Sequence, residues 1–522
     1  MIYPSLAYLA ALVAGTSVAA AAAPRAIVVM VVDDWGYADS ALNPDVVAPD
    51  IPMAHFRQLA AQGVLLTNNH AQPVCSPTRS ALMTGRFPFR DGMQHQNTIM
   101  PGSTAAIPLT TPTIPELLAE HASFDSYAVG KWHLGYAHWK NTPTGRGFKN
   151  HVGYFQGQVD YFNKTVGARG LIDGFDFWDG QDEFRDAVGN YSLPQYMAAV
   201  RRFVNEPRNA STGLFLYLSH QTVHVPLEAA GEDARCAHIE DYWRRVYCSM
   251  LVELDDTVPE LISILNSAVG EDWVMLTMAD NGGMVRWSES QGDHDKPNFP
   301  ASAGDNRPLR GSKTTLFEGG VRSTSFVTGG ATMIPEKARG TTYAGLMHAA
   351  DYAATVLALA GVDLSALAVP LDGLDHWHAM VGPTKTKSLR DHLPLNVVNN
   401  GSSYSAVRFG DMKLILGAPC LKIAVNAGAW FAGGLGQPVE PEPPHVSGAP
   451  YLFNVTADPY EHREINSSDP RYDSIVQEGR RILQGYVTSG AYFEPQQNRI
   501  HLAALPGLHG GAWKPWLPSD EL

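Results

Sequence analysis

The sequence predicts an α/β protein with a large, mostly parallel sheet that is covered by helices on both faces. Continuous apolar runs of strand length recur along the chain, at residues 26–32, 127–129, 214–218 and 273–278. Helix-like segments lie between them, for example at residues 113–121 and 242–265. Runs that are apolar at every position are typical of strands buried on both faces, and their alternation with helices favours parallel strands.

Length and composition indicate a globular protein with one large domain and a smaller companion. The chain has 522 residues, of which 45% are hydrophobic and 17% are charged, and it contains 48 glycines. It is long enough to bury a sizeable core. The formal net charge of -14 argues against a nucleic-acid partner, because affinity for phosphate backbones comes mostly from clustered Lys and Arg. A pocket for an anionic substrate must therefore be locally basic.

Both ends of the chain suggest the secretory pathway. Residues 1–23 carry no charged side chain and end in an alanine run, which predicts a signal peptide; an uncleaved membrane anchor is the alternative. The tail Ser519-Asp520-Glu521-Leu522 is a variant of the KDEL-type signal for retention in the endoplasmic reticulum, or a chance ending. Six N-x-S/T sequons fit passage through a glycosylating lumen. They start at Asn163, Asn190, Asn209, Asn400, Asn454 and Asn466.

The chain has only four cysteines, Cys75, Cys236, Cys248 and Cys420, which is too few for a disulfide framework. Cys236 with Cys248 is the one pair that we consider for a disulfide. The alternative is that all of the cysteines other than Cys75 stay free.

Polar residues follow each of the four predicted strands. In open α/β sheets, ligands bind beyond the carboxyl ends of the strands, so these clusters are expected to converge on one crevice. The four clusters are Asp33-Asp34, Lys131 with His133, His220 with His224, and Asp280-Asn281-Gly282-Gly283.

Four of these residues predict a metal site. Asp33, Asp34, Asp280 and Asn281 offer hard oxygen ligands with no Cys or His among them, which suits calcium or magnesium better than zinc. Calcium is favoured, because its flexible coordination tolerates ligands from two loops and leaves room for a substrate oxygen. An Asp-Asp pair alone would more often be a solvated turn or a helix N-cap.

Cationic and imidazole side chains complete the predicted site. Such a set would hold a tetrahedral oxyanion and supply proton-transfer groups near neutral pH. The expected substrate is therefore a sulfate or phosphate ester. Any one of these residues alone would more often be a surface charge or a structural histidine. The set consists of Arg79, Lys131, Lys313, His133 and His224.

The most specific stretch of the chain is CSPTRSALMTGR at residues 75–86. Pro77 is favoured in the first turn of a helix, so Cys75 is expected at a helix N-terminus, where backbone N–H groups attract anions. An unmodified thiol in that place would have a lowered pKa and could itself be a nucleophile.

This stretch resembles the signature of the sulfatase family, in which the cysteine is oxidised to formylglycine (3-oxoalanine). The resemblance extends over most of the chain and is closest to the arylsulfatase B branch, as DGMQHQ at residues 91–96 suggests. Ala279 departs from the serine that is common in the family, without removing a ligand. Further matching blocks are VVDDWGY, GKWHLG, RGF, FLYLSHQTVHVPL, DNGG, PLRGSKTTLFEGGVR, HAADYAATVLALAG, LDGLD and LFNVTADPYE.

The resemblance implies a role for each candidate residue. Asp33, Asp34, Asp280, Asn281 and the modified residue 75 would ligate one calcium ion. Residue 75 would be the nucleophile in its hydrated aldehyde form, with one hydroxyl activated by Asp280, and Arg79 and Lys131 would steady it. Lys131, His224 and Lys313 would bind the sulfate. His224 and Lys313 would assist departure of the alcohol, and His133 would remove the second hydroxyl proton. The covalent sulfate ester then collapses by elimination, so water need not attack a crowded sulfur.

The resemblance also implies an alkaline-phosphatase-like fold. We expect a sulfatase catalytic domain at 24–385 and a C-terminal α+β subdomain at 386–522. In the subdomain, residues 405–416 read as a hairpin turned at Gly410-Asp411, and residues 471–486 read as a helix. Residues 433–450 form a predicted loop, and a second loop at 288–306 could rim the pocket.

Three alternatives stay open. A metal phosphatase on the same fold would need more His and Asp ligands for two zinc ions and a Ser or Thr nucleophile. A formylglycine-dependent phosphate or phosphonate monoester hydrolase would share the modified residue. A non-catalytic binder of sulfated glycans would result if Cys75 is unmodified.

The resemblance finally implies a set of partners. The substrate would be an aryl sulfate or a sulfated carbohydrate with units like N-acetylgalactosamine 4-sulfate. The formylglycine-generating enzyme would act on the chain during maturation. A membrane would be a partner only if the leader stays uncleaved. The final compartment would be the lysosome or the extracellular space.

Overall fold

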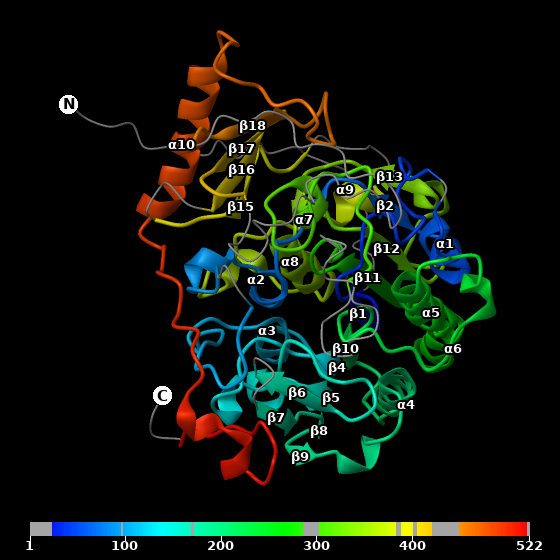
Figure 1. The fold of residues 1–522 in the computed structure, drawn as a ribbon. Coiled ribbons are helices and arrows are strands. Elements are labelled where there is room, and N and C mark those ends of the chain that lie inside the picture. Colours follow the sequence, from blue (N-terminus) through cyan, green and yellow to red (C-terminus); the bar gives the residue numbers. More distant parts are fainter. Residues whose placement is uncertain are drawn as a thin grey trace.

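The computed structural model describes residues 23–47, 49–94, 98–168, 172–285, 302–382, 388–399, 404–419 and 448–518, and a large mixed sheet lies at its centre (Figure 1). Its strands are β1 (Ala26–Val32), β2 (Val64–Leu66), β4 (Phe124–Lys131), β5 (Asn150–Tyr154), β8 (Trp178–Asp179), β9 (Asp182–Glu183), β10 (Gly213–His220), β11 (Trp273–Ala279), β12 (Ser325–Gly329) and β13 (Thr341–Tyr343). The strand order is β13-β2-β12-β11-β1-β10-β4-β5-β8-β9. The predicted α/β class is confirmed.

The four strands predicted from apolar runs are β1, β4, β10 and β11, and they lie side by side in the middle of the sheet. β1 pairs in parallel with β10 and β11, and β10 pairs in parallel with β4. In this register Val32 lies opposite His220 on one side and Ala279 on the other. The polar residues that follow these strands therefore leave the sheet at the same edge, as predicted.

Helices cover both faces of this sheet. The first face packs against α1 (Ala54–Ala61), α4 (Ser192–Val204), α5 (Tyr242–Asp256) and α6 (Val258–Val269). The second face packs against α2 (Cys75–Thr84), α3 (Ile114–His121), α8 (Ala349–Leu359) and α9 (Trp377–Val381). Along β1, alternate residues enter the two cores: Val28 the first and Val29 the second.

One predicted helix is divided in two. The segment 242–265 forms α5 and α6, which meet at Thr257. Pro259 lies in the first turn of α6, where a proline is favoured, and it cannot donate the backbone hydrogen bond that a continuous helix would need. The predicted helix at 113–121 is present as α3, with Thr113 as its N-cap in a capping box with Glu116.

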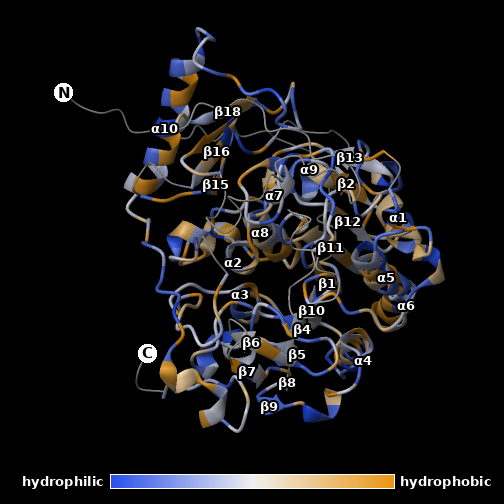
Figure 2. Ribbon diagram, viewed as in Figure 1, coloured by the Kyte–Doolittle hydropathy of each residue, from blue (hydrophilic) through white to orange (hydrophobic). Residues whose placement is uncertain are grey.

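A separate antiparallel sheet forms the core of the smaller C-terminal unit, in the order β15-β16-β17-β18. The predicted hairpin is β16 and β17, joined at Gly410-Asp411, and the predicted helix is α10. Hydrophobic and hydrophilic bands alternate along α10 in Figure 2, as expected for an amphipathic helix. The element bounds are β15 (His392–Asn396), β16 (Ser405–Phe409), β17 (Met412–Leu416), β18 (Tyr451–Asn454) and α10 (Tyr472–Thr488).

After α10 the chain runs back along the unit that contains the large sheet, as the red trace in Figure 1 shows. In this returning segment, residues 490–518, Gln496 donates to the carbonyl of Asp91 and Trp513 pairs with Phe175 through their backbones. Four short strands and one short helix complete the described β-strands and α-helices. They are β3 (Asn69–His70), β14 (Met347–His348), β6 (Thr165–Ala168), β7 (Ile172–Phe175) and α7 (Glu318–Val321).

Cys236 and Cys248 form a disulfide, with their Cα atoms 5.9 Å apart. The pair that the sequence singled out is therefore confirmed, whereas Cys420 lies outside the described residues. Among the residues that the structure describes, no helix combines the length and the apolar character needed to span a bilayer. The predicted signal peptide, the tail at 519–522, the sequon at Asn400 and most of both predicted loops also lie outside them.

His220 predicts a pH-dependent stability. Its side chain is buried at the end of β10, and neither ring nitrogen has a hydrogen-bond partner among the described residues. Burial lowers its pKa to about 3, against about 6.5 in an unfolded chain. The unfolded state therefore binds this proton first as the pH falls. Between about pH 6.5 and about pH 3, wild type should lose about 1.4 kcal/mol of unfolding free energy per pH unit, relative to His220→Leu. Urea unfolding across this pH range measures the difference, and parallel stability curves would contradict it.

Candidate active site

Two acidic pairs that are far apart in sequence meet at the carboxyl edge of the sheet. Asp33 and Asp34 follow β1, Asp280 and Asn281 follow β11, and all four side chains are buried. The backbone N–H of Asp34 donates to Asp280 Oδ1 at 3.2 Å, and Asn281 Nδ2 donates to Asp34 Oδ1 at 2.7 Å. The predicted convergence of the two pairs is therefore present.

Glycines after Asn281 allow this close approach. A Cβ atom at Gly282 would lie 1.8 Å from the carbonyl oxygen of Gly319, and one at Gly283 would lie 2.8 Å from the Cα of Gly36. A side chain at Gly283 would push the DNGG turn away from the segment that follows Asp33-Asp34, and one at Gly282 would push it away from α7.

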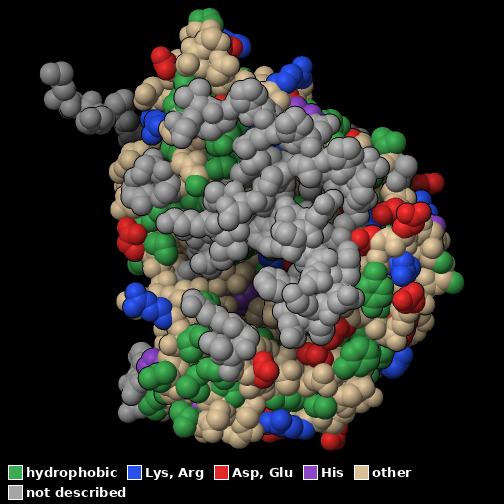
Figure 3. Space-filling view, in the orientation of Figure 1, with side chains coloured by type: hydrophobic (Ala, Val, Ile, Leu, Met, Phe, Trp, Pro, Cys, Tyr) green, Lys and Arg blue, Asp and Glu red, His purple; other side chains and the backbone are tan. Residues whose placement is uncertain are grey.

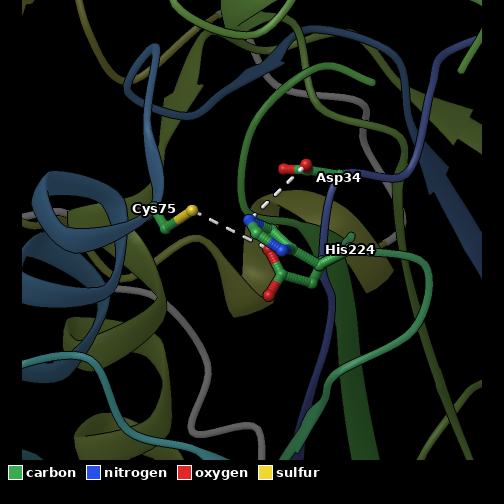
Figure 4. Close-up of side chains that lie close together, drawn as sticks. Asp34, Cys75 and His224 are labelled. Atoms are coloured by element: carbon green, nitrogen blue, oxygen red, sulfur yellow. Dashed lines mark hydrogen bonds and ion pairs between the residues drawn. The ribbon is translucent and has the colours of Figure 1, made fainter. Parts of the chain in front are cut away.

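Cys75 is the first residue of α2 and is fully buried against the acidic pairs. Its Sγ lies 3.8 Å from Asp33 Oδ1. Donor atoms of Asp33, Asp34, Cys75 and His224 all lie within 4.8 Å of one another, and Figure 4 shows Cys75, Asp34 and His224 pointing toward a common space. Position 75 is thus placed at a helix N-terminus in the site, as predicted.

The expected low pKa of an unmodified Cys75 thiol is wrong. Burial raises this pKa to about 12, although the charges of Lys131 and Lys313 oppose the rise. Burial disfavours the thiolate, and this effect exceeds the opposing effect of the lysine charges. An unmodified Cys75 is therefore protonated at neutral pH and is a poor nucleophile.

Two lysines neutralise the carboxylates of Asp33 and Asp34. Lys131 Nζ lies 2.6 Å from Asp33 Oδ2, and Lys313 Nζ lies 2.7 Å from Asp34 Oδ1. Burial alone would raise the pKa of both carboxyls, but the lysines and the other neighbouring cationic groups together outweigh it and hold both pKa values below their usual range. Both aspartates are ionised at neutral pH.

Arg79 lies one turn along α2 from Cys75 and binds Asp280. Its Nη2 is 2.7 Å from Asp280 Oδ2 and 3.5 Å from Asp33 Oδ2. Its other terminal nitrogen donates to the hydroxyls of Ser219 and Tyr217 on β10. These two partners were not predicted from the sequence, although the alternation of side chains along β10 places both on the face that α2 covers.

His224 presents one nitrogen to the site. Its Nδ1 lies 2.8 Å from the carbonyl oxygen of Val225; because a carbonyl only accepts, Nδ1 carries the proton in the neutral ring. Nε2 faces Asp34 Oδ2 at 3.8 Å (Figure 4). Burial and then the charge of Lys313 lower the pKa of His224. The pKa of Lys313 is raised, so His224 is the more readily deprotonated of the two.

The His133 ring is held by the backbone of Ile99, which is itself bonded to Ser76, the residue after Cys75. Its Nε2 donates to the carbonyl of Ile99 at 3.0 Å, and the N–H of Ile99 donates to Ser76 Oγ at 3.2 Å. Its buried Nδ1 has no hydrogen-bond partner among the described residues. Burial and then the charge of Lys131 hold the pKa of His133 well below its usual range. A neutral ring with a free nitrogen can accept a proton.

The residues present fit a bound cation. Asn281 Oδ1 is buried and has no hydrogen-bond partner in the described part of the chain. Beside it, Asp33 and Asp34 supply ionised carboxylate oxygens, the donors that calcium prefers. A buried oxygen without a partner, such as Asn281 Oδ1, is costly, and a hard cation would satisfy it.

The fold, and a site with buried carboxylates and cationic side chains beside a helix N-terminus, are typical of a hydrolase that acts on esters of a tetrahedral oxyanion. The chain belongs to the sulfatase family, because it matches the family described as "Sulfatase" over residues 25–362. It is therefore an enzyme that hydrolyses sulfate esters. The finer resemblance to the arylsulfatase B branch stays a prediction.

Curated relatives and solved structures agree with this membership. Arylsulfatase J of Mus musculus is 29% identical over 95% of this chain and 81% of its own length. N-acetylgalactosamine-6-sulfatase of Mus musculus is 26% identical over 94% of this chain and 91% of its own. The crystal structure of Ps i-CgsB superposes with a TM-score of 0.70 at 25% identity and covers 91% of this chain and 94% of that one.

The coloured part of the surface in Figure 3 carries Lys and Arg side chains singly among acidic ones, and they form no continuous basic patch there. The cationic side chains described above are instead buried in the site: Lys131 and Arg79 are 1% and 0% exposed. The basic character expected for an anion pocket is therefore local, within a chain of net charge -14.

Proposed function

We propose that this enzyme hydrolyses sulfate esters of sulfated glycans with a formylglycine formed from Cys75 and with one calcium ion. The observation that carries the proposal is the convergence of Cys75, Asp33 and Asp34 in one buried space. The raised pKa of the thiol supports the need for oxidation, because the unmodified side chain lacks a nucleophile at neutral pH.

Charge balance supports an anionic substrate. Three cationic side chains, Arg79, Lys131 and Lys313, are paired with three carboxylates, Asp33, Asp34 and Asp280. Bound calcium would supply a Lewis acid beside residue 75 and an excess of positive charge. Lys131 and Lys313 would then be drawn toward a sulfate group, His224 would protonate the leaving alcohol and His133 would accept a proton from residue 75.

Removal of calcium should abolish turnover and lower the melting temperature. Calcium binding should stabilise the folded chain, because the buried carboxylates then gain a ligand that the unfolded chain lacks. Asn281→Ala should weaken calcium binding by about tenfold or more, since it removes one oxygen donor. Titration of the metal-free protein, followed by its melting temperature and by turnover, measures both effects. Equal activation by zinc would contradict the calcium assignment.

His224→Ala should keep the fold and lower turnover by on the order of 10²–10⁴, as expected for loss of a general acid. The effect should be largest for sulfate esters of poorly acidic alcohols. Steady-state kinetics on an unactivated sulfate ester measures it, with the melting temperature as the control for folding. Turnover within a factor of a few of wild type would remove the proposed role.

Glycan substrates are supported by what the relatives act on. One relative is named N-acetylgalactosamine-6-sulfatase. Ps i-CgsB has been crystallised in complex with k-i-k-neocarrahexaose. We propose a sulfated hexosamine unit, with the 4-sulfate as the first candidate. Parallel assays on N-acetylgalactosamine 4-sulfate and 6-sulfate, and on aryl sulfate and aryl phosphate, test this. Preference for the phosphate ester would favour the monoester phosphohydrolase instead.

Maturation would take place in the secretory pathway. The formylglycine-generating enzyme would oxidise Cys75, and sequons exposed in the described structure, such as Asn163 and Asn190, would carry glycans. Secretion or lysosomal delivery is the proposed destination, with retention in the endoplasmic reticulum as the alternative. Mass spectrometry of the peptide that spans residue 75 tests the conversion; an unmodified cysteine would favour a non-catalytic glycan binder.

A further inference from the structure

The segment that carries His224 is bound to the metal-ligand loop on one side. The N–H of Val223 donates to the carbonyl of Asp33 at 2.7 Å, and the N–H of Asp33 donates to the carbonyl of Thr222 at 2.9 Å. The N–H of His224 donates to the carbonyl of Gln221 at 3.0 Å, which closes a turn. The imidazole therefore has little freedom relative to Asp33 as long as this turn keeps its shape.

A tyrosine outside the proposed catalytic set holds the same turn from the other side. The Tyr161 hydroxyl donates to the carbonyls of both Gln221 and His224, at 3.0 Å each. Its side chain is 1% exposed, and its backbone N–H donates to Glu228 Oε2 at 2.8 Å. Tyr161 thus fixes the two ends of the turn and a residue four positions beyond it.

A second layer supports this contact. The Gln221 side chain is fully buried, accepts from the Tyr196 hydroxyl at 3.1 Å and donates to the carbonyl of Val159. Tyr196 belongs to α4, and Val159 lies two residues before Tyr161. The turn is therefore connected to the hydrophobic core that contains Val159, Tyr161 and Tyr196.

We propose that Tyr161 is a positioning residue that aims His224 Nε2 at the leaving oxygen of the sulfate ester. The proposal rests on the proposed role of His224 as the general acid. When the S–O bond to the alcohol breaks, the alkoxide oxygen takes both electrons of that bond and a proton from Nε2 of the doubly protonated ring, which leaves a neutral imidazole with its proton on Nδ1. Without the Tyr161 hydroxyl, two buried carbonyls lose their shared donor and the turn can shift, which lengthens this proton transfer.

The test is the dependence of rate on the leaving group. Tyr161→Phe keeps the ring and removes the hydroxyl alone. A series of substituted phenyl sulfates varies the need for proton donation, because 4-nitrophenolate leaves without help and unsubstituted phenolate does not. Tyr161→Phe should lower kcat for phenyl sulfate by about tenfold and for 4-nitrophenyl sulfate by less than about twofold, with KM unchanged.

Matched variants separate this role from a structural one. Tyr191→Phe is the control, because that ring stacks on Tyr161 with centroids 5.6 Å apart and its hydroxyl donates to the carbonyl of Glu228. It should behave as wild type across the series. Tyr196→Phe should act in the same direction as Tyr161→Phe but more weakly, and it carries the test if Tyr161→Phe does not fold.

Each outcome decides between the two hypotheses. An equal loss of rate on all phenyl sulfates in Tyr161→Phe would overturn the positioning role and leave a purely structural one. His224→Ala serves as the reference for the whole series. If it does not steepen the leaving-group dependence, the general-acid role of His224 fails; if it does and Tyr161→Phe does not, only the role of Tyr161 fails.

Discussion

Cys75→Ala is expected to reduce the turnover of sulfate esters to the uncatalysed rate, a loss on the order of 10⁶-fold or more. The other groups near position 75 can bind and polarise a sulfate ester, but none of them is placed to attack sulfur. Lys131, Lys313 and Arg79 are paired with carboxylates, and Asp280 is bonded to Arg79. Steady-state kinetics with purified protein measures the loss.

Two controls make this result specific. The melting temperature of Cys75→Ala should stay near that of wild type, because the substitution removes only a small side-chain group and keeps the backbone of α2. Cys75→Ser restores a hydroxyl but not an aldehyde hydrate, so it should give at most one turnover, followed by a stable sulfate ester on residue 75. Sustained turnover by either variant would show that residue 75 is not the nucleophile.

The central sheet was predictable because its four parallel strands are apolar at every position. A strand such as Ala26–Val32 is buried on both faces, so its sequence carries no alternation that a helix or a half-exposed strand could imitate. The polar residues that follow then converge by topology alone, since parallel strands end at one edge. The placement of Asp33, Asp34, Asp280 and Asn281 needed no further information.

The sequence could not predict the environment of each group. The pKa of Cys75 depends on burial by side chains from distant segments, and its position at a helix N-terminus suggested the wrong direction. Likewise, Tyr161 lies in an irregular segment with no motif of its own, and its contact with His224 spans 63 positions. The break between α5 and α6 was visible in the sequence as Pro259, but the hydrophobic period continues across it.

A buried charge network that was not predicted from the sequence joins β17 of the C-terminal sheet to helix α7. Lys413 of β17 lies 2.9 Å from Glu318 Oε1 and 2.8 Å from Glu461 Oε1, and all three side chains are fully buried. His70 and Arg322 lie 3.3 Å from the other oxygen of Glu318. Burial opposes ionisation of Glu318, but the charge of Lys413 holds its pKa well below the usual range.

This network borders the segment that supplies Lys313. The Tyr404 hydroxyl, from the C-terminal unit, donates to the carbonyl of Thr314, and the N–H of Thr314 donates to the carbonyl of Pro73, two residues before Cys75. Glu318 follows four residues later, and its N–H donates to Glu461 Oε2 at 2.6 Å. The smaller unit therefore holds the loop that carries one of the two site lysines.

Lys413→Met should destabilise the protein by about 3–5 kcal/mol, the range for a buried ion pair that loses one partner. Two buried carboxylates, Glu318 and Glu461, would then lack their shared cation. Burial already raises the pKa of Glu461, so this carboxyl should take up a proton in the variant. Chemical unfolding at neutral pH measures the loss, and it should shrink at lower pH as the carboxyls become neutral.

The double variant Lys413→Met with Glu461→Gln separates charge from packing. It removes one of the uncompensated carboxylates and leaves Glu318 with His70 and Arg322, so it should recover part of the lost stability. Arg481→Met, which breaks an exposed pair with Glu478, should leave the unfolding midpoint unchanged. If Lys413→Met lost no more stability than Arg481→Met, the network would not be what holds the C-terminal unit against the Lys313 loop. Reduced turnover in Lys413→Met below its melting temperature would follow from displacement of Lys313, because the ion pairs of Lys413 are with Glu318 and Glu461 and not with residue 75.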